Sequence, residues 1–147
     1  MLIVAVGAAL GFGAYRAIVD GRFAGTHRVR GGEPAADEAA DATVPMSVLA
    51  GAELAHELGE RATLLQFSSA FCAPCRATRR VLADVADAVP GVVHVEVDAE
   101  HHLELVRRLG ILRTPTTLIL DANGVELSRA AGAPRKEQVL SSLAAAL

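Results

Sequence analysis

The pattern of apolar and polar positions divides the 147-residue chain into three parts. Residues 1–20 are mostly apolar, and no charged side chain occurs before Arg16. Residues 21–46 lack a periodic apolar face and are rich in Gly, Ala, Pro and acidic side chains. Residues 47–147 alternate short apolar runs with apolar positions at helical spacing, which is typical of a folded domain. The pattern therefore predicts an N-terminal membrane anchor, a flexible linker and one domain.

Within the third part, apolar runs predict strands, and a period near 3.6 residues predicts helices. We expect strands at 63–69, 92–97, 116–120 and 125–130, and helices at 50–58, 73–88, 100–109 and from 134 onward. The dipeptide Asn123-Gly124 is a hairpin signal that joins the last two strands. The strand–helix–strand order makes the first two core strands parallel, so the domain is expected to be α/β.

The first part has the length and composition of a membrane anchor. A helix that spans a bilayer needs about 20 apolar residues. Residues 2–19 reach that range if the Arg16 side chain extends to the interface. A cleaved signal peptide and a buried helix are the alternatives. A signal peptide usually carries a basic segment before its apolar run, and no basic side chain precedes the apolar run here.

Charges that follow the apolar run predict its orientation. Arg16, Arg22, Arg28 and Arg30 all lie after it, and basic residues near a membrane helix stay on the cytoplasmic side. We therefore expect a single-pass anchor with the domain on the cytoplasmic side, and an extracytoplasmic domain is the alternative. Residues 21–46 cannot bury enough surface to offset their ordering entropy, so they would let the domain range over the membrane.

Composition and charge exclude several classes of protein. With 52% hydrophobic residues and a net charge of −3, the chain is not disordered as a whole. The mildly acidic balance argues against a nucleic-acid partner, because such proteins usually present a basic domain. Two cysteines are too few for a disulfide-rich secreted scaffold.

The two cysteines form the motif Cys72-Ala73-Pro74-Cys75 at the predicted junction of a strand and a helix. The start of a helix offers unpaired backbone N–H groups and a positive dipole end, which stabilise a thiolate. Cys72 is therefore the predicted nucleophile, and Cys75, one turn later, is the predicted resolving cysteine. Pro74 suits the first helical turn, where its missing N–H is not needed.

Two structural interpretations of this pair are weaker. A zinc site would need two further Cys or His ligands at fixed spacing, and neither a second C-x-x-C nor an H-x-x-x-H follows. A static disulfide would close too short a loop to add much stability. We therefore expect a redox-active dithiol, with no metal and no other cofactor.

From Leu49 to Leu147 the order of motifs resembles the thioredoxin family. The resemblance rests on the strand–C-x-P-C–helix segment, on Arg113-Thr114-Pro115-Thr116, on the hairpin and on the glycine before the last helix. It implies the thioredoxin fold, a central mixed sheet flanked by helices, with a cis peptide at Thr114–Pro115 facing the cysteines. It also implies a substrate-binding surface formed by Phe71, Ala73, Pro74, Thr114, Pro115 and Gly132.

Four positions depart from the family pattern. Phe71 stands in place of the usual Trp, and Ala73 in place of the usual Gly. Six positions before the nucleophile the family usually carries a buried acidic residue, and Gln66 replaces it here. The amide of Gln66 cannot take a proton from the resolving cysteine. One hypothesis is that His94, at the place of a family lysine, or a water molecule assists Cys75 instead. The alternative is that His94 is an ordinary strand histidine.

Together these features predict a thiol–disulfide oxidoreductase that reduces or exchanges protein disulfides through a mixed disulfide. Its expected partners are disulfide-containing proteins, a thiol reductase or other electron donor, and the membrane. The alternative is a thioredoxin-fold adaptor, whose cysteines gate a binding surface with little turnover.

Overall fold

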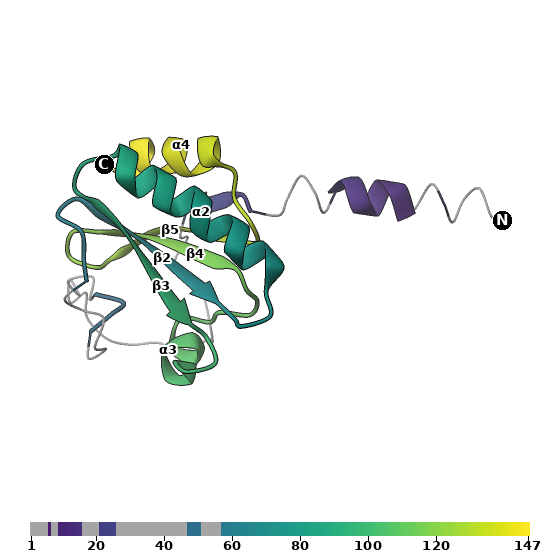
Figure 1. The fold of residues 1–147 in the computed structure, drawn as a ribbon, viewed down its shortest axis with the longest axis horizontal. Coiled ribbons are helices and arrows are strands. Elements are labelled where there is room, and N and C mark those ends of the chain that lie inside the picture. Colours follow the sequence, from purple (N-terminus) through teal and green to yellow (C-terminus); the bar gives the residue numbers. More distant parts are fainter. Residues whose placement is uncertain (1–5, 7–8, 16–20, 26–46, 51–56) are drawn as a thin grey trace, which may run out of the picture.

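The computed structural model describes residues 6, 9–15, 21–25, 47–50 and 57–147. Its strands and helices follow one another in the order shown in Figure 1. The strands are β1 (Phe23–Gly25), β2 (Ala62–Ser68), β3 (Val92–Asp98), β4 (Thr116–Asp121) and β5 (Glu126–Ala131). The helices are α2 (Ala73–Ala88), α3 (Leu103–Arg108) and α4 (Lys136–Ala146).

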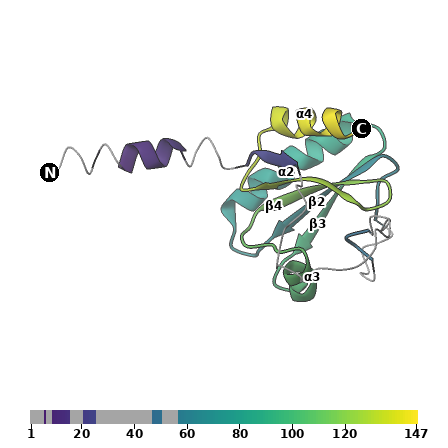
Figure 2. The same ribbon diagram turned by 180° about the vertical axis from the view of Figure 1, so that it is seen from behind.

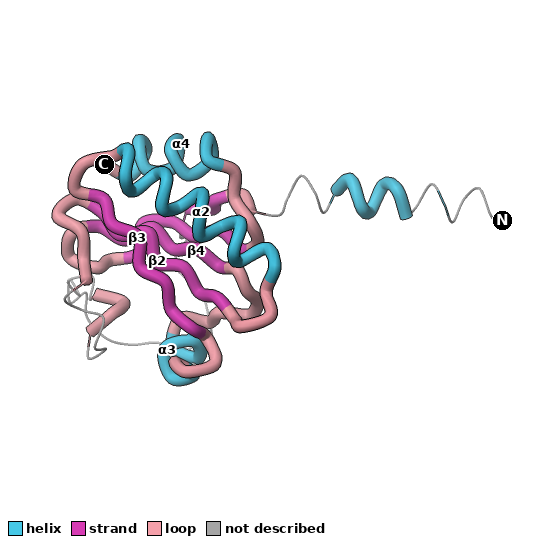
Figure 3. Tube along the Cα trace, viewed as in Figure 1, coloured by secondary structure: helices cyan, strands magenta, loops and turns pink. Residues whose placement is uncertain are grey.

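The five strands form one mixed sheet in the order β1-β5-β4-β2-β3. Strands β2 and β3 are parallel, and the remaining neighbours are antiparallel. Figure 3 shows the strands as a continuous layer between helices. The predicted α/β architecture, the parallel first pair of core strands and the hairpin at Asn123-Gly124 are confirmed.

Helices cover both faces of this sheet. In Figures 1 and 2, α2 and α4 lie together on one face, and α3 lies on the other side, near the end of β3. Side chains of β2 alternate between the two faces: Leu64 joins the cluster under α2 and α4, whereas Leu65 and Phe67 join the cluster on the α3 side. Every residue of β2 is buried, so this strand lies at the centre of the domain.

Helix boundaries follow from local chemistry. Helix α2 has the predicted bounds, because Cys72 caps its N-terminus and Pro90-Gly91 follows its end. Helix α3 begins later than predicted. The Asp98 carboxylate accepts hydrogen bonds from the Glu100 backbone N–H (2.9 Å) and from His101 Nδ1 (2.8 Å), which holds residues 98–101 in a turn.

Strand β1 corrects the predicted linker. Phe23–Gly25 pair antiparallel with β5 and form an edge of the sheet, and Phe23 packs against the cluster under α4. Just before the strand, the Gly21 backbone N–H donates to the Ala131 carbonyl (2.9 Å). Three residues are too few to show strand alternation, and their partner is more than a hundred residues away in the sequence. The other residues predicted as linker, 26–46, lie outside the described part.

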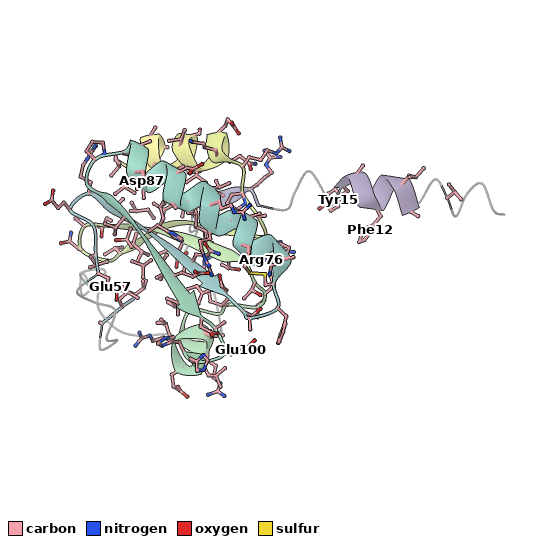
Figure 4. The ribbon with its side chains drawn as sticks, viewed as in Figure 1. Phe12, Tyr15, Glu57, Arg76, Asp87 and Glu100 are labelled. Carbon is pink, nitrogen blue, oxygen red and sulfur yellow. A yellow bond between two sulfur atoms is a disulfide. The ribbon has the colours of Figure 1, made fainter. Side chains whose placement is uncertain are left out.

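The predicted anchor is described only in part. Residues 9–15 are helical, and their largest apolar side chains, Leu10, Phe12 and Tyr15, are exposed; Figure 4 shows Phe12 and Tyr15 projecting from this helical stretch. Over the residues that the structure describes, no helix is long and apolar enough to cross a membrane. Residues 1–5, 7–8 and 16–20 of the predicted anchor, and residues 51–56 of the helix predicted at 50–58, lie outside the described part.

Replacing Gly21 by Ala is expected to release β1 from the sheet. Gly21 has a φ of +75°, and an added Cβ would collide with the Ala133 carbonyl and the Pro134 Cα. The left-handed backbone alone costs an L-residue about 1–2 kcal/mol. Hydrogen exchange should therefore accelerate at Phe23–Gly25 and along β5, while β2 remains protected.

The matched control is Gly13→Ala, because an added Cβ at Gly13 meets nothing within 4 Å. Equal exchange at β1 in both variants would contradict the proposed close packing at Gly21.

Candidate active site

Cys72 and Cys75 are joined by a disulfide where the loop after β2 enters α2. Their Cα atoms are 5.2 Å apart, and the Cys75 backbone N–H lies 3.2 Å from the Cys72 sulfur. Cys75 is 2% exposed, whereas Cys72 is only partly buried. A nucleophile from solvent can therefore reach Cys72, whereas the surrounding protein covers Cys75.

The start of α2 favours a thiolate at Cys72 once the disulfide is reduced. Cys72 is the N-cap residue, so unpaired N–H groups and the positive end of the helix dipole point toward its sulfur. The structure pairs both cysteines with each other. Among the residues described, no group of three or more His, Cys, Asp or Glu side chains is placed to hold a metal ion.

A hollow of about 310 Å³ lies beside the disulfide. It brings together four of the predicted substrate-binding residues, together with three neighbours; its lining is Pro74, Arg113, Thr114, Pro115, Gly132, Ala133 and Arg135. The Thr114–Pro115 peptide is cis, as predicted. The Pro115 carbonyl accepts a hydrogen bond from the Gly132 N–H (2.8 Å), which fixes the two walls of the hollow to each other.

The other two predicted substrate-binding residues lie outside that lining. Ala73 is exposed on the first turn of α2, and the Phe71 side chain is 100% exposed. Leu112, in the loop before the cis peptide, is 95% exposed and was not among the predicted site residues. Two large apolar side chains are thus open to solvent on loops that lead into the site.

Gln66 lies behind Cys75 and is fully buried. Its Nε2 donates to the Cys75 carbonyl (3.0 Å) and to Ser68 Oγ (2.8 Å). Its Oε1 accepts from His94 Nε2 (3.1 Å), because an amide oxygen has no proton to give. These bonds join His94 to Cys75 through the Gln66 amide and the Cys75 backbone rather than through sulfur.

Burial lowers the pKa of His94 below its usual 6.5. The charge of Glu96 opposes this shift, and the charge of Arg79 adds to it. His94 is therefore neutral at pH 7, with its proton on Nε2. In this neutral state His94 donates a hydrogen bond to Gln66.

Three residues beside Cys75 are not among those that the sequence predicts for the site. Ser68 Oγ donates to Glu96 Oε1 (2.6 Å), and Arg79 pairs with the same carboxylate (2.9 Å). All three line a second hollow, of about 290 Å³, together with both cysteines and with Arg76, which Figure 4 labels on α2. A signal was present in the spacing, since Arg79 follows Cys75 by one helical turn.

The Glu96 carboxylate is held ionised by these partners. Burial raises its pKa, but hydrogen bonds from Arg79 and Ser68 and the charge of Arg79 outweigh burial, so that the pKa is lowered from 4.5. The ion pair links α2 to β3 at the hollow that Cys75 also lines.

Residues 46–145 match the family model described as Thioredoxin. The chain belongs to the thioredoxin family. Among solved structures, thioredoxin from Fasciola hepatica superimposes with a TM-score of 0.56 at 22% identity, covering 65% of this chain and 89% of that one. This likeness supports the thioredoxin fold.

Thioredoxin-family relatives match at moderate identity. "Thioredoxin H-type" of Oryza sativa subsp. indica is 29% identical over 83 residues, which is 56% of this chain and 66% of the relative. "Thioredoxin" of Alicyclobacillus acidocaldarius subsp. acidocaldarius is 33% identical over 87 residues, 58% of this chain and 82% of the relative. The chain spans less than two thirds of the rice protein and 61% of "Thioredoxin H-type 1" from Nicotiana tabacum.

Replacing His94 by Gln should change the pH dependence of stability. The folded pKa of His94 is lowered, so below its usual value of 6.5 the unfolded chain binds a proton that the folded chain does not. Wild type should therefore lose stability as the pH falls from 7 through 6.5, until the folded pKa is reached. The variant should lose less over that window, as measured by urea unfolding at several pH values.

A pH slope of stability that is the same in His94→Gln as in wild type would contradict the burial argument for His94.

Proposed function

We propose that this chain is a thiol–disulfide oxidoreductase that reduces protein disulfides with the Cys72–Cys75 pair. One observation carries the proposal: a reachable Cys72 is joined to a buried Cys75 at the start of α2, beside a hollow walled by a cis proline. Membership of the thioredoxin family supports it. The dithiol is the only redox group that the reaction needs.

The exchange proceeds in two steps that balance in atoms and electrons. The Cys72 thiolate attacks one sulfur of a substrate disulfide, forms a mixed disulfide and releases the other substrate sulfur as a thiolate. Cys75 then loses its proton and attacks the Cys72 sulfur. This step releases the second substrate thiolate and restores the Cys72–Cys75 disulfide. The substrate gains two electrons, and a thiol reductase or low-molecular-weight thiol must return two to the protein.

Substrate is proposed to lie along the hollow beside the cis peptide. Pro74, Thr114, Pro115 and Gly132 all line it. An extended peptide binds such an edge through its backbone, in the manner of an added strand. The exposed Phe71 ring offers an apolar contact beside Cys72.

A redox-gated binding module is the second candidate. It is favoured by Gln66, because a buried amide against Cys75 supplies no proton acceptor for the resolving thiol. In that case the disulfide and dithiol forms would differ in partner binding, with little turnover.

Cysteine variants separate the two candidates. In an insulin disulfide reduction assay with dithiothreitol, Cys72→Ser and Cys75→Ser are each expected to lose at least about a hundredfold in rate, because each removes one of the two covalent steps. Cys75→Ser should also accumulate a mixed disulfide at Cys72, detectable by mass spectrometry.

Thr78→Ser is a control for the same helix, since Thr78 is buried one turn after Pro74 and bears no sulfur. Wild-type protein without turnover, but with partner binding that depends on its redox state, would favour the adaptor.

His94 is proposed to act as a positioning residue for Cys75, by holding the Gln66 amide against the Cys75 carbonyl. His94→Gln should then keep the shape of the pH–rate profile, since a Gln side chain also donates to Gln66. Disappearance of a titration from that profile would instead favour a proton relay through His94.

We infer further that the N-terminal apolar segment binds a membrane, with the domain on the cytoplasmic side. The support is the uncharged sequence before Arg16, the arginines that follow it and the exposure of Leu10 and Phe12. Alkylation of reduced Cys72 by a membrane-impermeant reagent in whole cells should require lysis. Labelling of intact cells would place the domain outside.

A further inference from the structure

The chain enters the folded domain at the rim of the substrate hollow. The Gly21 N–H donates to the Ala131 carbonyl (2.9 Å), at the end of β5. The Gly21 Cα also lies so close to Ala133 and Pro134 that no side chain fits there. Ala133 lines the hollow together with Gly132 and the cis proline. The N-terminal segment therefore leaves the domain beside the redox site.

This entry point shortens the tether. Between the helical residues 9–15 and Gly21, only residues 16–20 intervene. Six peptide units extend at most about 22 Å, so Tyr15 lies no farther than that from Gly21. A free linker over 21–46 would instead have a mean end-to-end distance of about 28 Å and a maximum of about 90 Å. Because β1 belongs to the sheet, residues 26–46 connect two points of the domain and do not lengthen the tether.

A lipid bilayer is the occupant that the apolar segment fits. Leu10, Phe12 and Tyr15 are all exposed, and the sequence carries no charge before Arg16. Arg16 and Arg22 flank the tether, and basic residues at that place favour an anionic headgroup surface.

We propose that β1 holds the dithiol site close to the membrane surface. The substrates of this site are then disulfides that belong to membrane-bound proteins and lie near the bilayer. The inference rests on the proposed oxidoreductase function and on membrane binding. A short tether raises the effective concentration of the site near the surface, and that concentration falls steeply as a tether lengthens. The fold thus selects substrates by their distance from the bilayer, with the exchange chemistry unchanged.

Two insertions of the same sequence test the tether. About 20 Gly and Ser residues are inserted into the full chain, either between Asp20 and Gly21 or between Ala40 and Asp41. Only the first insertion lengthens the path from the apolar segment to the site. Each protein is bound to phosphatidylcholine–phosphatidylglycerol vesicles that carry a lipid-anchored peptide disulfide on a short or a long spacer. A soluble disulfide serves as the common reference.

Wild type should reduce the short-spacer probe faster than the long-spacer probe. Insertion before Gly21 should lower the ratio of the two rates by roughly five- to tenfold, as expected for a tether lengthened from six to about 26 units. Insertion after Ala40 should leave the ratio unchanged. Equal ratios in all three proteins, or equal effects of both insertions, would overturn the inference.

Flotation with the same vesicles tests membrane binding separately. Wild type should float, and a Leu10→Glu, Phe12→Glu double variant should not. Failure of wild type to float would also overturn the inference, while leaving the oxidoreductase function untouched. Failure of wild type to reduce the soluble disulfide would instead overturn the proposed function.

Discussion

Complete burial of β2 is the constraint on which the rest of the structure depends. A strand buried on both faces must satisfy its backbone through neighbours, and β2 does so with β3 on one side and β4 on the other. Leu64, Leu65 and Phe67 send apolar side chains to opposite faces, so helices must cover both. The strand then ends at the loop that delivers Cys72 to the start of α2. Core packing and the position of the nucleophile thus have one origin.

The same burial explains the polar chain behind the cysteines. A fully buried amide is costly unless its hydrogen bonds are made, and Gln66 makes them to Cys75, Ser68 and His94. Ser68 in turn donates a hydrogen bond to Glu96, whose charge is balanced by Arg79 from α2. An ion pair this exposed adds little stability by itself. The pair joins α2 to β3 at the hollow that Cys75 lines.

Strand β1 gives the N-terminal segment a defined attachment to the domain. An edge strand of three residues contributes little burial, yet its register with β5 determines where the chain leaves the sheet. It leaves at Ala131, next to the glycine that bonds to the cis proline. The attachment and the hollow at the cis proline therefore share one corner of the domain.

The sequence by itself determined the α/β pattern, the bounds of α2, the hairpin and the cysteine pair at a helix start, because each depends on contacts within a few residues. Resemblance to the thioredoxin family added the cis proline. The sequence did not predict β1, because its partner strand is remote. It also placed the start of α3 too early, although the Asp98 turn that delays the helix is a local contact. The sequence predicts Gln66 and His94 as site residues but not Glu96 or Arg79, because Glu96 and Arg79 come together only when β3 packs against α2. Only the tertiary structure decided which polar groups surround Cys75 and where residues 21–25 join the sheet, because both are set by contacts between segments far apart in the chain.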